Sequence, residues 1–470
     1  MASDFHQGVI RSLRDGALRG HLRRAMDMLM EKRQALFPDP DELESLRRRC
    51  MAIRAHALSN LPELLERAEA RCEENGIRVH WAETPEEANG IVHDILQRHG
   101  VTRLVKGKSM VSEEMGLNHY LEARGIECLE SDLGEFIIQL AGETPSHIVM
   151  PALHKSKQQI AELFHEKFPD IPYTDDVDEL TAAARAILRE KFQQAEAGLS
   201  GVNFLVAETG TLCLVENEGN GRMSTTVPPL HIAVTGIEKV VEQLADVPPL
   251  LSLLPRSATG QRITTYFNMI SGPRKSGEKD GPHEVHLVLL DNGRSRIYAD
   301  EELQATLRCI RCGACINHCP VYTRLGGHAY GTVYPGPIGS ILEPQKEGLD
   351  RLGELAEAST LCGACGEVCP VRIPIPQLLN RLRWESVRRD GDGGTRGQGG
   401  RRKSSQAALW RAWASLASHP KLYRIAVASA SRFRRLLPQQ LGPWTSVRKA
   451  PRIADKPLRQ IVDAEGEGHE

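Results

Sequence analysis

The sequence lacks any apolar run long enough to cross a membrane. No stretch of about eighteen uninterrupted apolar residues occurs among its 470 residues. The N-terminal segment also lacks the apolar core of a secretory signal. Hydrophobic residues make up 41% and charged residues 26% of the chain, which suits a globular protein with two or three cores. We therefore expect a cytoplasmic protein without a transmembrane segment.

The sequence also lacks a complete nucleotide-binding motif. The segment Lys106–Ser109 is similar to the end of a phosphate-binding loop, but Thr102 stands where that motif needs its first glycine. In Gly219–Ser224, serine replaces the third glycine of a dinucleotide fingerprint. Because no flavin or nicotinamide signature is present, we do not expect hydride chemistry from this chain alone, and we assign no catalytic residue.

Cysteine is concentrated in two short motifs. Cys309–Cys319 follows the pattern C-x2-C-x2-C-x3-C and precedes a proline, as in the run that holds a cubane iron–sulfur cluster. A partial copy, Cys362–Cys369, ends in the same Cys-Pro pair. This spacing predicts a protein that transfers electrons.

The two motifs predict two clusters with crossed ligands, because in two-cluster ferredoxins the fourth cysteine of a motif binds the other cluster. The predicted ligands of the first cluster are Cys309, Cys312, Cys315 and Cys369. Those of the second are Cys319, Cys362 and Cys365. The second site is one thiolate short, since Ser359 stands at the position that matches Cys309.

Three interpretations of the second site remain open. It can hold a four-iron cluster with Ser359, water or His328 on the fourth iron, a three-iron cluster, or a four-iron cluster with one open corner. Structural zinc is the main alternative for clustered cysteines, but seven cysteines in two registers closed by Cys-Pro fit it poorly. A disulfide scaffold does not suit eleven cysteines in a chain of this length.

The hydrophobic pattern predicts four regions. These are an N-terminal helical segment (1–60), an α/β domain (61–295), a helical ferredoxin-like domain (296–390), and a flexible linker with a basic tail (391–470). Within the α/β domain, strands are expected at 77–82, 103–106, 126–129, 147–150, 204–207, 211–215, 232–234, 264–270 and 284–290. Alternating helices and strands predict a parallel sheet covered on both faces.

Charged residues follow two of the expected strands. Lys106 and Lys108 end one strand and Glu208 ends another, so they are candidates for an anionic pocket at the strand carboxyl ends. The alternative, which we favour, is that the lysines are surface charges and that Glu208 belongs to a solvated turn.

The chain resembles the iron–sulfur subunit of the bacterial L-lactate utilisation system, lactate utilisation protein B. The segments that carry the resemblance are Val105–Glu114, Ala207–Thr211, Gly326–Gly339 and Leu361–Val371. The resemblance implies an α/β fold of the sugar-phosphate isomerase and CoA-transferase type. It also implies a helical ferredoxin module like that of succinate dehydrogenases. The missing fourth ligand is typical of the lactate utilisation protein B family.

The same resemblance implies a role in oxidising L-lactate to pyruvate, beside a cysteine-rich subunit and a second α/β subunit. One hypothesis makes this chain an electron-transfer subunit whose α/β domain serves assembly. In a second, the α/β domain itself binds the acid. In a third, the chain is a ferredoxin-like subunit of another organic-acid oxidoreductase.

Further expectations concern side chains around the motifs and in the tail. Arg311 and His318 either place positive charge beside a cluster or point to solvent. The glycines of Gly326–Gly339 are expected to let backbone pack closely around the clusters, with a substrate or quinone contact by Tyr330 or Tyr334 as the alternative.

The basic tail carries sixteen Lys or Arg between Arg381 and Lys449. With the apolar stripe of Leu409, Trp413 and Leu416, it predicts a helix that docks on an acidic partner. Peripheral contact with anionic lipid is the second interpretation, and nucleic acid is a distant third. The alternative to a docking role is a solvated tail. No recognised fold supports nucleic-acid binding.

Overall fold

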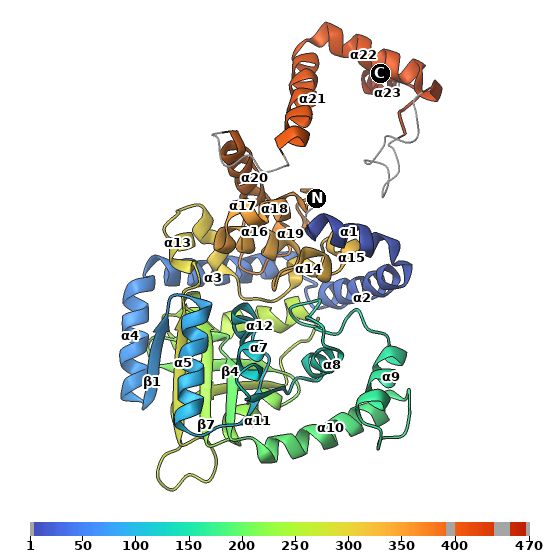
Figure 1. Ribbon diagram of the computed structural model, residues 1–470. Helices are drawn as coiled ribbons and strands as arrows, with labels where there is room; N and C mark the ends of the chain where they lie inside the picture. The colour runs from blue at the N-terminus through green and yellow to red at the C-terminus, as the bar shows by residue number, and fades with distance from the viewer. Residues whose placement is uncertain (1–3, 392–399, 437–451, 467–470) are drawn as a thin grey trace. The chain divides into compact units, whose positions relative to one another are not determined.

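The computed structural model describes residues 4–391, 400–436 and 452–466. The chain divides into two compact units, Met1–Ser386 and Val387–Glu470. The first unit contains the central sheet and both cysteine motifs (Figure 1). Among the described residues, no helix combines the length and apolar character that a membrane span requires.

Six parallel strands form the central sheet in the order β1-β10-β7-β4-β2-β3. The strands are β1 (Ile77–Ala82), β2 (Arg103–Lys106), β3 (Glu127–Glu130), β4 (Ala197–Gly201), β7 (Leu230–Gly236) and β10 (Glu284–Leu290). The prediction of an α/β protein with a parallel sheet is confirmed.

Both faces of this sheet are buried, which explains the continuous apolar run in β10. Val285, Leu287 and Leu289 belong to one core cluster, whereas Val288 and Leu290 belong to another on the opposite face. Side chains alternate between the faces of a strand, so two covered faces favour apolar residues at successive positions, as in Leu287–Leu290.

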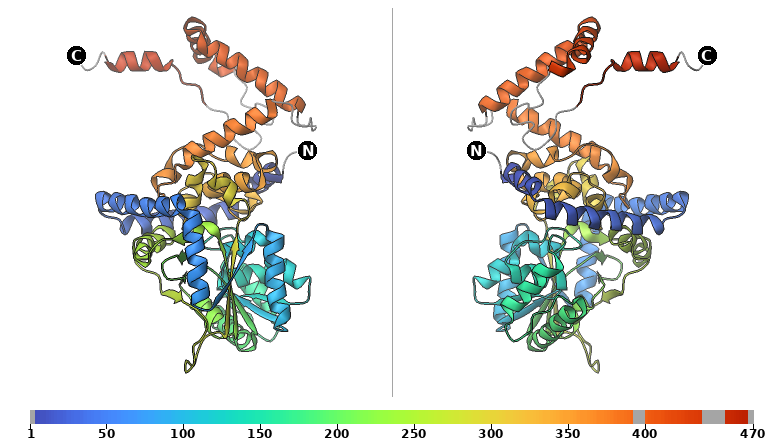
Figure 2. Two further views of the ribbon diagram at one scale, coloured as in Figure 1. Left: turned by 90° about the vertical axis from the view of Figure 1, so that its left-hand side faces the viewer. Right: turned by 90° about the vertical axis from the view of Figure 1, so that its right-hand side faces the viewer.

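Helices cover the two faces in separate layers (Figure 2). One core cluster contains residues of α5 (Pro85–Arg98), α6 (Met110–Met115) and α7 (Leu117–Glu122). The other contains residues of α4 (Leu61–Glu74), α12 (Val247–Ala258) and a second sheet, in the order β8-β5-β6-β9.

The strands of that second sheet are β5 (Phe204–Val206), β6 (Thr211–Glu216), β8 (Val240–Val241) and β9 (Tyr266–Ile270). The other helices of this region are α8 (Leu133–Ala141), α9 (Lys157–Lys167), α10 (Val177–Gln194), α11 (Asn220–Thr226), η1 (Ile237–Lys239) and η2 (Leu244–Asp246).

Two local predictions about strands were wrong. Residues 147–150 form no strand, because Nδ1 of His147 accepts hydrogen bonds from the backbone N–H groups of Val149 and Met150 at 3.0 and 3.2 Å. The side chain thus holds a turn in place of a sheet ladder. The central strand β4 was missed, because its sequence Ala-Gly-Leu-Ser-Gly has no β-branched residue. A Cβ on its Gly198 would lie 1.7 Å from the Ser224 carbonyl oxygen of α11, so this strand needs glycine there.

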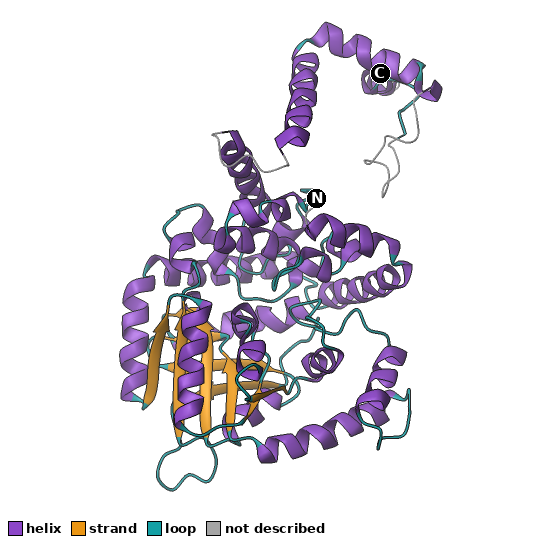
Figure 3. Cartoon of the chain, viewed as in Figure 1, coloured by secondary structure: helices purple, strands orange, loops and turns teal. Residues whose placement is uncertain are grey.

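The cysteine motifs lie in an all-helical region above the strands (Figure 3). Its elements are α13 (Arg294–Tyr298), η3 (Leu303–Arg308), α14 (Ala314–Asn317), α15 (Tyr322–Leu325), η4 (His328–Tyr330), α16 (Gly336–Glu347), α17 (Leu349–Leu352), α18 (Glu354–Glu357), α19 (Ala364–Glu367) and α20 (Ile375–Gly391).

The N-terminal helices pack against this cysteine region. They are α1 (Asp4–Arg14), α2 (Gly16–Ala35) and α3 (Pro40–Ser59). Arg47 of α3 donates to the carbonyl oxygens of Cys369 and Gly366 at 2.9 and 3.1 Å. In α1, a Cβ on Gly8 would lie 2.8 Å from the Ala329 carbonyl oxygen. The first helices therefore form part of the wall around the cysteine loops.

The second unit consists of short helices with many exposed apolar side chains. They are α21 (Gly400–Ser418), α22 (Pro420–Arg432), η5 (Arg434–Leu436) and α23 (Leu458–Gly466). Trp413 of α21 meets Tyr423 of α22 with ring centroids 6.3 Å apart. Leu409 and Trp413 of the predicted stripe are exposed, and Leu416 is half-buried. Most of the predicted linker, residues 392–399, and the last two basic residues before Ala450 lie outside the described residues.

Candidate iron–sulfur centre

The two cysteine loops repeat one backbone conformation fifty residues apart. Arg311 and Leu361 precede the second cysteine position of their loops and have φ angles of 60° and 55°. The glycines that follow that cysteine, Gly313 and Gly363, have φ angles of 74° and 88°. A bulky residue with positive φ is uncommon and costs energy. Its occurrence at matching positions shows that both loops are shaped to present side chains in the same way.

The structure brings four cysteines of the predicted first set together. Cys309, Cys312, Cys315 and Cys369 line one small cavity, although the last comes from the second motif. All four are buried, and Ile148, Ile338 and Ile373 complete the lining. Burial, followed by the negative charges of the other three sulfurs, raises the pKa of Cys315 well above its usual value. Four neighbouring sulfurs in an apolar cavity can be thiolates together only with a cationic group between them, which the iron of a cluster would supply.

The predicted second set is also clustered, but it is more open to solvent. Cys319 and Cys365 are buried, whereas Cys362 is exposed. Burial raises the pKa of Cys365 to about 12, and the charges of Cys319 and Cys362 add to this effect. The three sulfurs therefore lie close enough to interact.

Ser359 occupies the place in the second loop that Cys309 occupies in the first. The backbone N–H of Arg311 donates to Sγ of Cys309 at 3.4 Å, and that of Leu361 donates to Oγ of Ser359 at 3.1 Å. His328, the other protein ligand considered, instead donates from Nε2 to the Thr144 carbonyl oxygen at 2.7 Å. The geometry therefore favours Ser359 over His328 as the residue at the fourth ligand position of the second cluster site.

Backbone N–H groups also point at the last cysteine of each motif. Tyr322 donates to Sγ of Cys319 at 3.5 Å and Ile373 donates to Sγ of Cys369 at 3.3 Å. Such hydrogen bonds stabilise thiolate charge and tune a bound cluster.

Of the two residues expected to bring positive charge, the structure supports Arg311. Its guanidinium lies 3.2 Å from Glu238 and 4.5 Å from the Tyr334 ring centroid. Burial lowers the pKa of His318, and Nδ1 of this residue donates to the Ala314 carbonyl oxygen at 2.9 Å. Burial therefore disfavours a positive charge on His318.

A buried ion network that the sequence did not reveal joins the α/β region to the first cysteine loop. Arg294 lies at its centre, with Nε 2.5 Å from Glu238 and Nη2 2.7 Å from Glu114. The Tyr334 hydroxyl donates to Glu114 at 2.5 Å, and Lys346 lies 2.9 Å from the same carboxylate. Because Glu238 also binds Arg311, the position of the loop depends on residues far from it in sequence.

The charged residues predicted at the strand ends separate into different environments. Lys106 is buried and pairs with Glu113 at 2.9 Å and Glu130 at 2.6 Å, so its interpretation as a surface charge was wrong. Lys108 lines a cavity at the strand ends. Glu208 accepts a hydrogen bond from the Leu244 backbone at 2.9 Å and lies outside this cavity lining.

The glycine-rich segment between the motifs packs backbone against backbone. A Cβ on Gly327 would lie 1.9 Å from the Ser146 carbonyl oxygen, and one on Gly339 would lie 1.5 Å from that of Tyr334. Tyr330 is buried beside Phe5, with ring centroids 5.8 Å apart. Only glycine permits such close approach.

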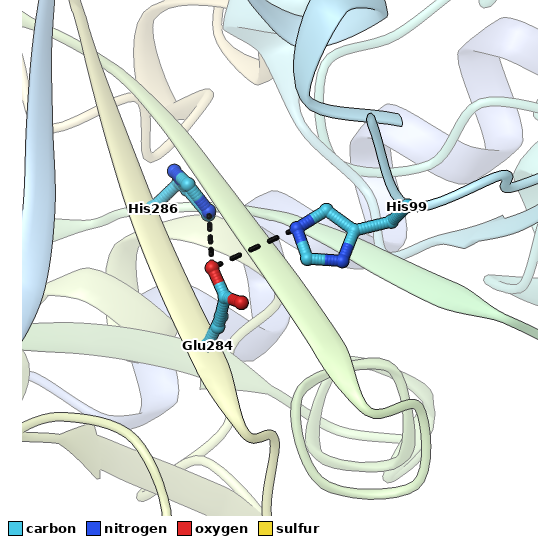
Figure 4. A group of neighbouring side chains, drawn as sticks. All are labelled: His99, Glu284 and His286. Carbon is cyan, nitrogen blue, oxygen red and sulfur yellow. Dashed lines mark ion pairs between the residues drawn. The ribbon is translucent and has the colours of Figure 1, made fainter. Parts of the chain in front are cut away.

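A separate group of possible metal ligands lies at the amino end of β10 (Figure 4). His99 and His286 each have Nε2 3.6 Å from Oε2 of Glu284. Arg78 lies 2.7 Å from the same oxygen and supplies the compensating charge. This group is therefore an ion-pair cluster, far in sequence from the cysteine loops.

The cysteine sulfurs are spaced too widely for a single zinc ion. Sulfur ligands of a tetrahedral zinc site lie about 3.8 Å apart, given a Zn–S distance of about 2.3 Å. Among the described residues, which include all eleven cysteines, no three cysteine sulfurs lie within 4.8 Å of one another.

Comparison with known proteins agrees with this geometry. Residues 305–373 match the family model of a 4Fe-4S dicluster domain. Residues 65–290 match the LUD domain, and residues 381–467 match the C-terminal domain of lactate utilisation protein B. Fold and site together define an iron–sulfur protein with an α/β region and a dicluster region.

Curated relatives cover almost the whole chain. "Lactate utilization protein B" of Bacillus subtilis is 41% identical over 95% of this chain and 93% of its own length. The protein of the same name from Geobacillus is 43% identical over 83% of this chain and 82% of its own. "Uncharacterized electron transport protein YkgF" of Escherichia coli is 41% identical over 91% of this chain and 88% of its own. The chain belongs to the lactate utilisation protein B family, and the predicted resemblance is confirmed.

Proposed function

We propose that this chain is the iron–sulfur electron-transfer subunit of a complex that oxidises L-lactate to pyruvate and allows growth on lactate. Family membership and the dicluster domain support an iron–sulfur electron-transfer role in lactate utilisation. The observation that carries the proposal is the cavity in which cysteines of both motifs meet. Lactate gives up two electrons on oxidation, and each cubane cluster, when bound, takes up and releases one.

The proposed ligands are those of the crossed arrangement. Cys309, Cys312, Cys315 and Cys369 bind the first [4Fe-4S] cluster, whereas Cys319, Cys362 and Cys365 bind the second. The second cluster is a [4Fe-4S] cluster with a ligand other than cysteine, or a [3Fe-4S] cluster. Ser359 is the candidate protein ligand, because it holds the place of Cys309.

The remaining parts of the proposal concern assembly and location. The partners are a cysteine-rich subunit and a second α/β subunit, and the site of action is the cytoplasm. The α/β region belongs to the isomerase and CoA-transferase type of fold, with domains at 61–295 and 296–390 after the helical segment 1–60. The tail, 391–470, docks on an acidic partner through α21, where Leu409, Trp410 and Trp413 are exposed.

The first test measures iron, acid-labile sulfide and EPR on protein purified without oxygen. The expected result is about eight iron atoms per chain and cubane signals that L-lactate reduces only when both partner subunits are present. Two results would contradict the proposal. One is zinc in place of iron, and the other is that L-lactate does not reduce the clusters even when both partner subunits are present. Deleting residues 391–470 tests the tail, because unchanged association with the partners would reject docking.

A second candidate function is binding of the organic acid by the α/β region itself. The observation that favours it is a cavity of about 290 Å³ at the strand carboxyl ends, lined by Lys108, Lys239 and Arg311.

If another oxidoreductase complex uses this chain, the clusters will be reduced by a different acid. Comparing L-lactate with other 2-hydroxy acids as electron donors in the reconstituted complex separates a lactate-oxidising complex from one that oxidises another acid.

A further inference from the structure

One cavity in the first unit is built jointly by the α/β region and the first cysteine loop. It has a volume of about 290 Å³, close to the lower end of small-ligand sites. Residues that follow β2 and β4 line one side, and Arg311 and Tyr334 line the other. Ligands of open parallel sheets bind outside the strand carboxyl ends, so this cavity lies where such a site is expected.

Two buried cations of this cavity have too few acceptors. Lys239 is 7% exposed, and its one described hydrogen bond, to the Cys309 carbonyl oxygen, is long at 3.5 Å. Arg311 binds Glu238 through Nη2, but its buried Nε has no hydrogen-bond partner among the described residues. Burial lowers the pKa of Lys239 to about 7, because a buried ammonium or guanidinium without enough acceptors is costly. Both donors therefore indicate an anion that the protein chain does not itself supply.

The third cation of the cavity provides a comparison. Lys108 donates to the Val149 carbonyl oxygen at 3.1 Å and lies 3.4 Å from Glu135. Its acceptors are thus provided by the fold. The shortage of acceptors is confined to the wall that carries Lys239 and Arg311.

The rest of the lining limits what the anion can be. Asp132, Glu216 and Glu218 also line the cavity, and their charges oppose a large or multiply charged anion. A carboxylate carries one negative charge, and a guanidinium donates to it in a planar, charge-assisted arrangement. Asn203, Thr259 and Gln261 offer polar groups for a neighbouring hydroxyl or keto oxygen.

We propose that this cavity binds a small 2-hydroxy or 2-oxo acid, with its carboxylate between Lys239 and Arg311 beside the first cysteine loop. The choice of acid rests on the proposed function, because the contacts alone specify a small singly charged carboxylate. Bound in this way, the acid lies next to the residues that hold the first cluster.

The competing explanation is that Lys239 and Arg311 only balance the charge of the cluster. The two explanations differ in what a lysine substitution changes. If Lys239 only balances charge, replacing it should shift the reduction potential of the cluster and leave acid binding unchanged. An acid site requires weaker binding of the acid.

The test is isothermal titration of the full chain, with its clusters in place, using pyruvate, L-lactate, acetate and inorganic sulfate. Lys239→Met keeps the length of the side chain and removes its charge, and Lys239→Arg restores a cation. Lys191→Met, which breaks a surface pair with Glu127, is the control. Losing a charge-assisted contact is expected to weaken pyruvate binding about tenfold or more. Lys239→Arg should recover most of the affinity, and the control should bind like the wild type.

Three results would overturn the proposal. They are equal pyruvate affinity in Lys239→Met and wild type, sulfate binding as tight as that of pyruvate, and no binding of either acid by the wild type. If Lys239→Met loses iron, Lys239→Arg and competition among the four anions on the wild type still decide the question. Lactate-driven cluster reduction with the partners is measured separately. Reduction without acid binding rejects this inference alone, whereas acid binding without reduction rejects the proposed function alone.

Discussion

Ser359 and Cys309 hold equivalent positions in two copies of one loop, and each accepts the backbone N–H of the residue two places later. The equivalence extends to the positive φ angles of Arg311 and Leu361 and to the short helices that follow. Ser359 therefore replaces the eighth cysteine in a loop whose backbone conformation matches that of the first loop. The loop itself is shaped as if a ligand were present.

The Ser359→Cys variant should supply the missing thiolate to the second cluster. Because thiolate binds iron more tightly than a hydroxyl, the cluster should resist losing iron when it is oxidised. EPR after ferricyanide treatment measures this, through the signal of a three-iron cluster. We expect a weaker signal than in the wild type, with Ser359→Ala as the control. Equal signals in all three proteins would show that position 359 does not face the cluster.

Crossed ligation predicts that each last cysteine affects the cluster of the other motif. Cys369→Ser should remove the first cluster and leave the second, although Cys369 belongs to the second motif. Cys319→Ser should do the reverse. Iron content should fall by about half in each variant, and the remaining EPR spectra should differ from each other. If Cys369→Ser and Cys362→Ser left the same cluster behind, ligation would not be crossed.

The buried network around Glu238 should be essential for stability. Burial raises the pKa of this carboxyl, but Arg294, Lys239 and Arg311 together lower it to about 2, so it is charged in the fold. Glu238→Gln leaves Arg294 and Arg311 without this partner and should cost about 3–5 kcal/mol. Urea unfolding under nitrogen, followed by circular dichroism, measures the loss.

A surface pair provides the control for this variant. Glu127 pairs with Lys191 at 2.7 Å, and both side chains are more than a third exposed. Glu127→Gln should therefore cost no more than about 1 kcal/mol. Equal losses in Glu127→Gln and Glu238→Gln would contradict the importance given to the network.

The α/β region should lose stability as the pH falls below about 6.5. Burial, with a further contribution from His286, lowers the pKa of His231 to about 3, so its ring is neutral in the fold. An unfolded chain binds a proton there below about 6.5, and the native chain does not until about pH 3. Stability from this group is therefore complete above pH 6.5 and decreases as the pH falls.

Between pH 7.5 and 5.5 this single histidine should lower the free energy of unfolding by about 1.4 kcal/mol. The measurement compares urea midpoints at the two pH values for the wild type and His231→Gln. The variant should show a smaller decrease between the two values. Identical decreases would mean that His231 is not held neutral by its burial beside Ser200.

Several features of the fold could be predicted from local sequence. Strands β1, β2 and β10 begin and end where the apolar patterns place them, because each run is bounded by polar or helix-starting residues. Strand β4 could not be predicted in this way. Its Gly198 is explained only by the Ser224 carbonyl oxygen of a helix that packs directly on it.

The sequence by itself determined the cysteine registers and the parallel α/β pattern, because both depend on spacing along the chain. It also determined the family, through the segments that resemble it. Tertiary structure alone decided which buried cations have partners. Lys106 meets Glu113 and Glu130, whereas Lys239 beside Cys309 meets no carboxylate within 4 Å in the described part of the chain. The physical reason is that the effect of a buried charge depends on its distance from groups on other elements. Those distances are fixed only when the sheet, the helices and the cysteine loops pack together.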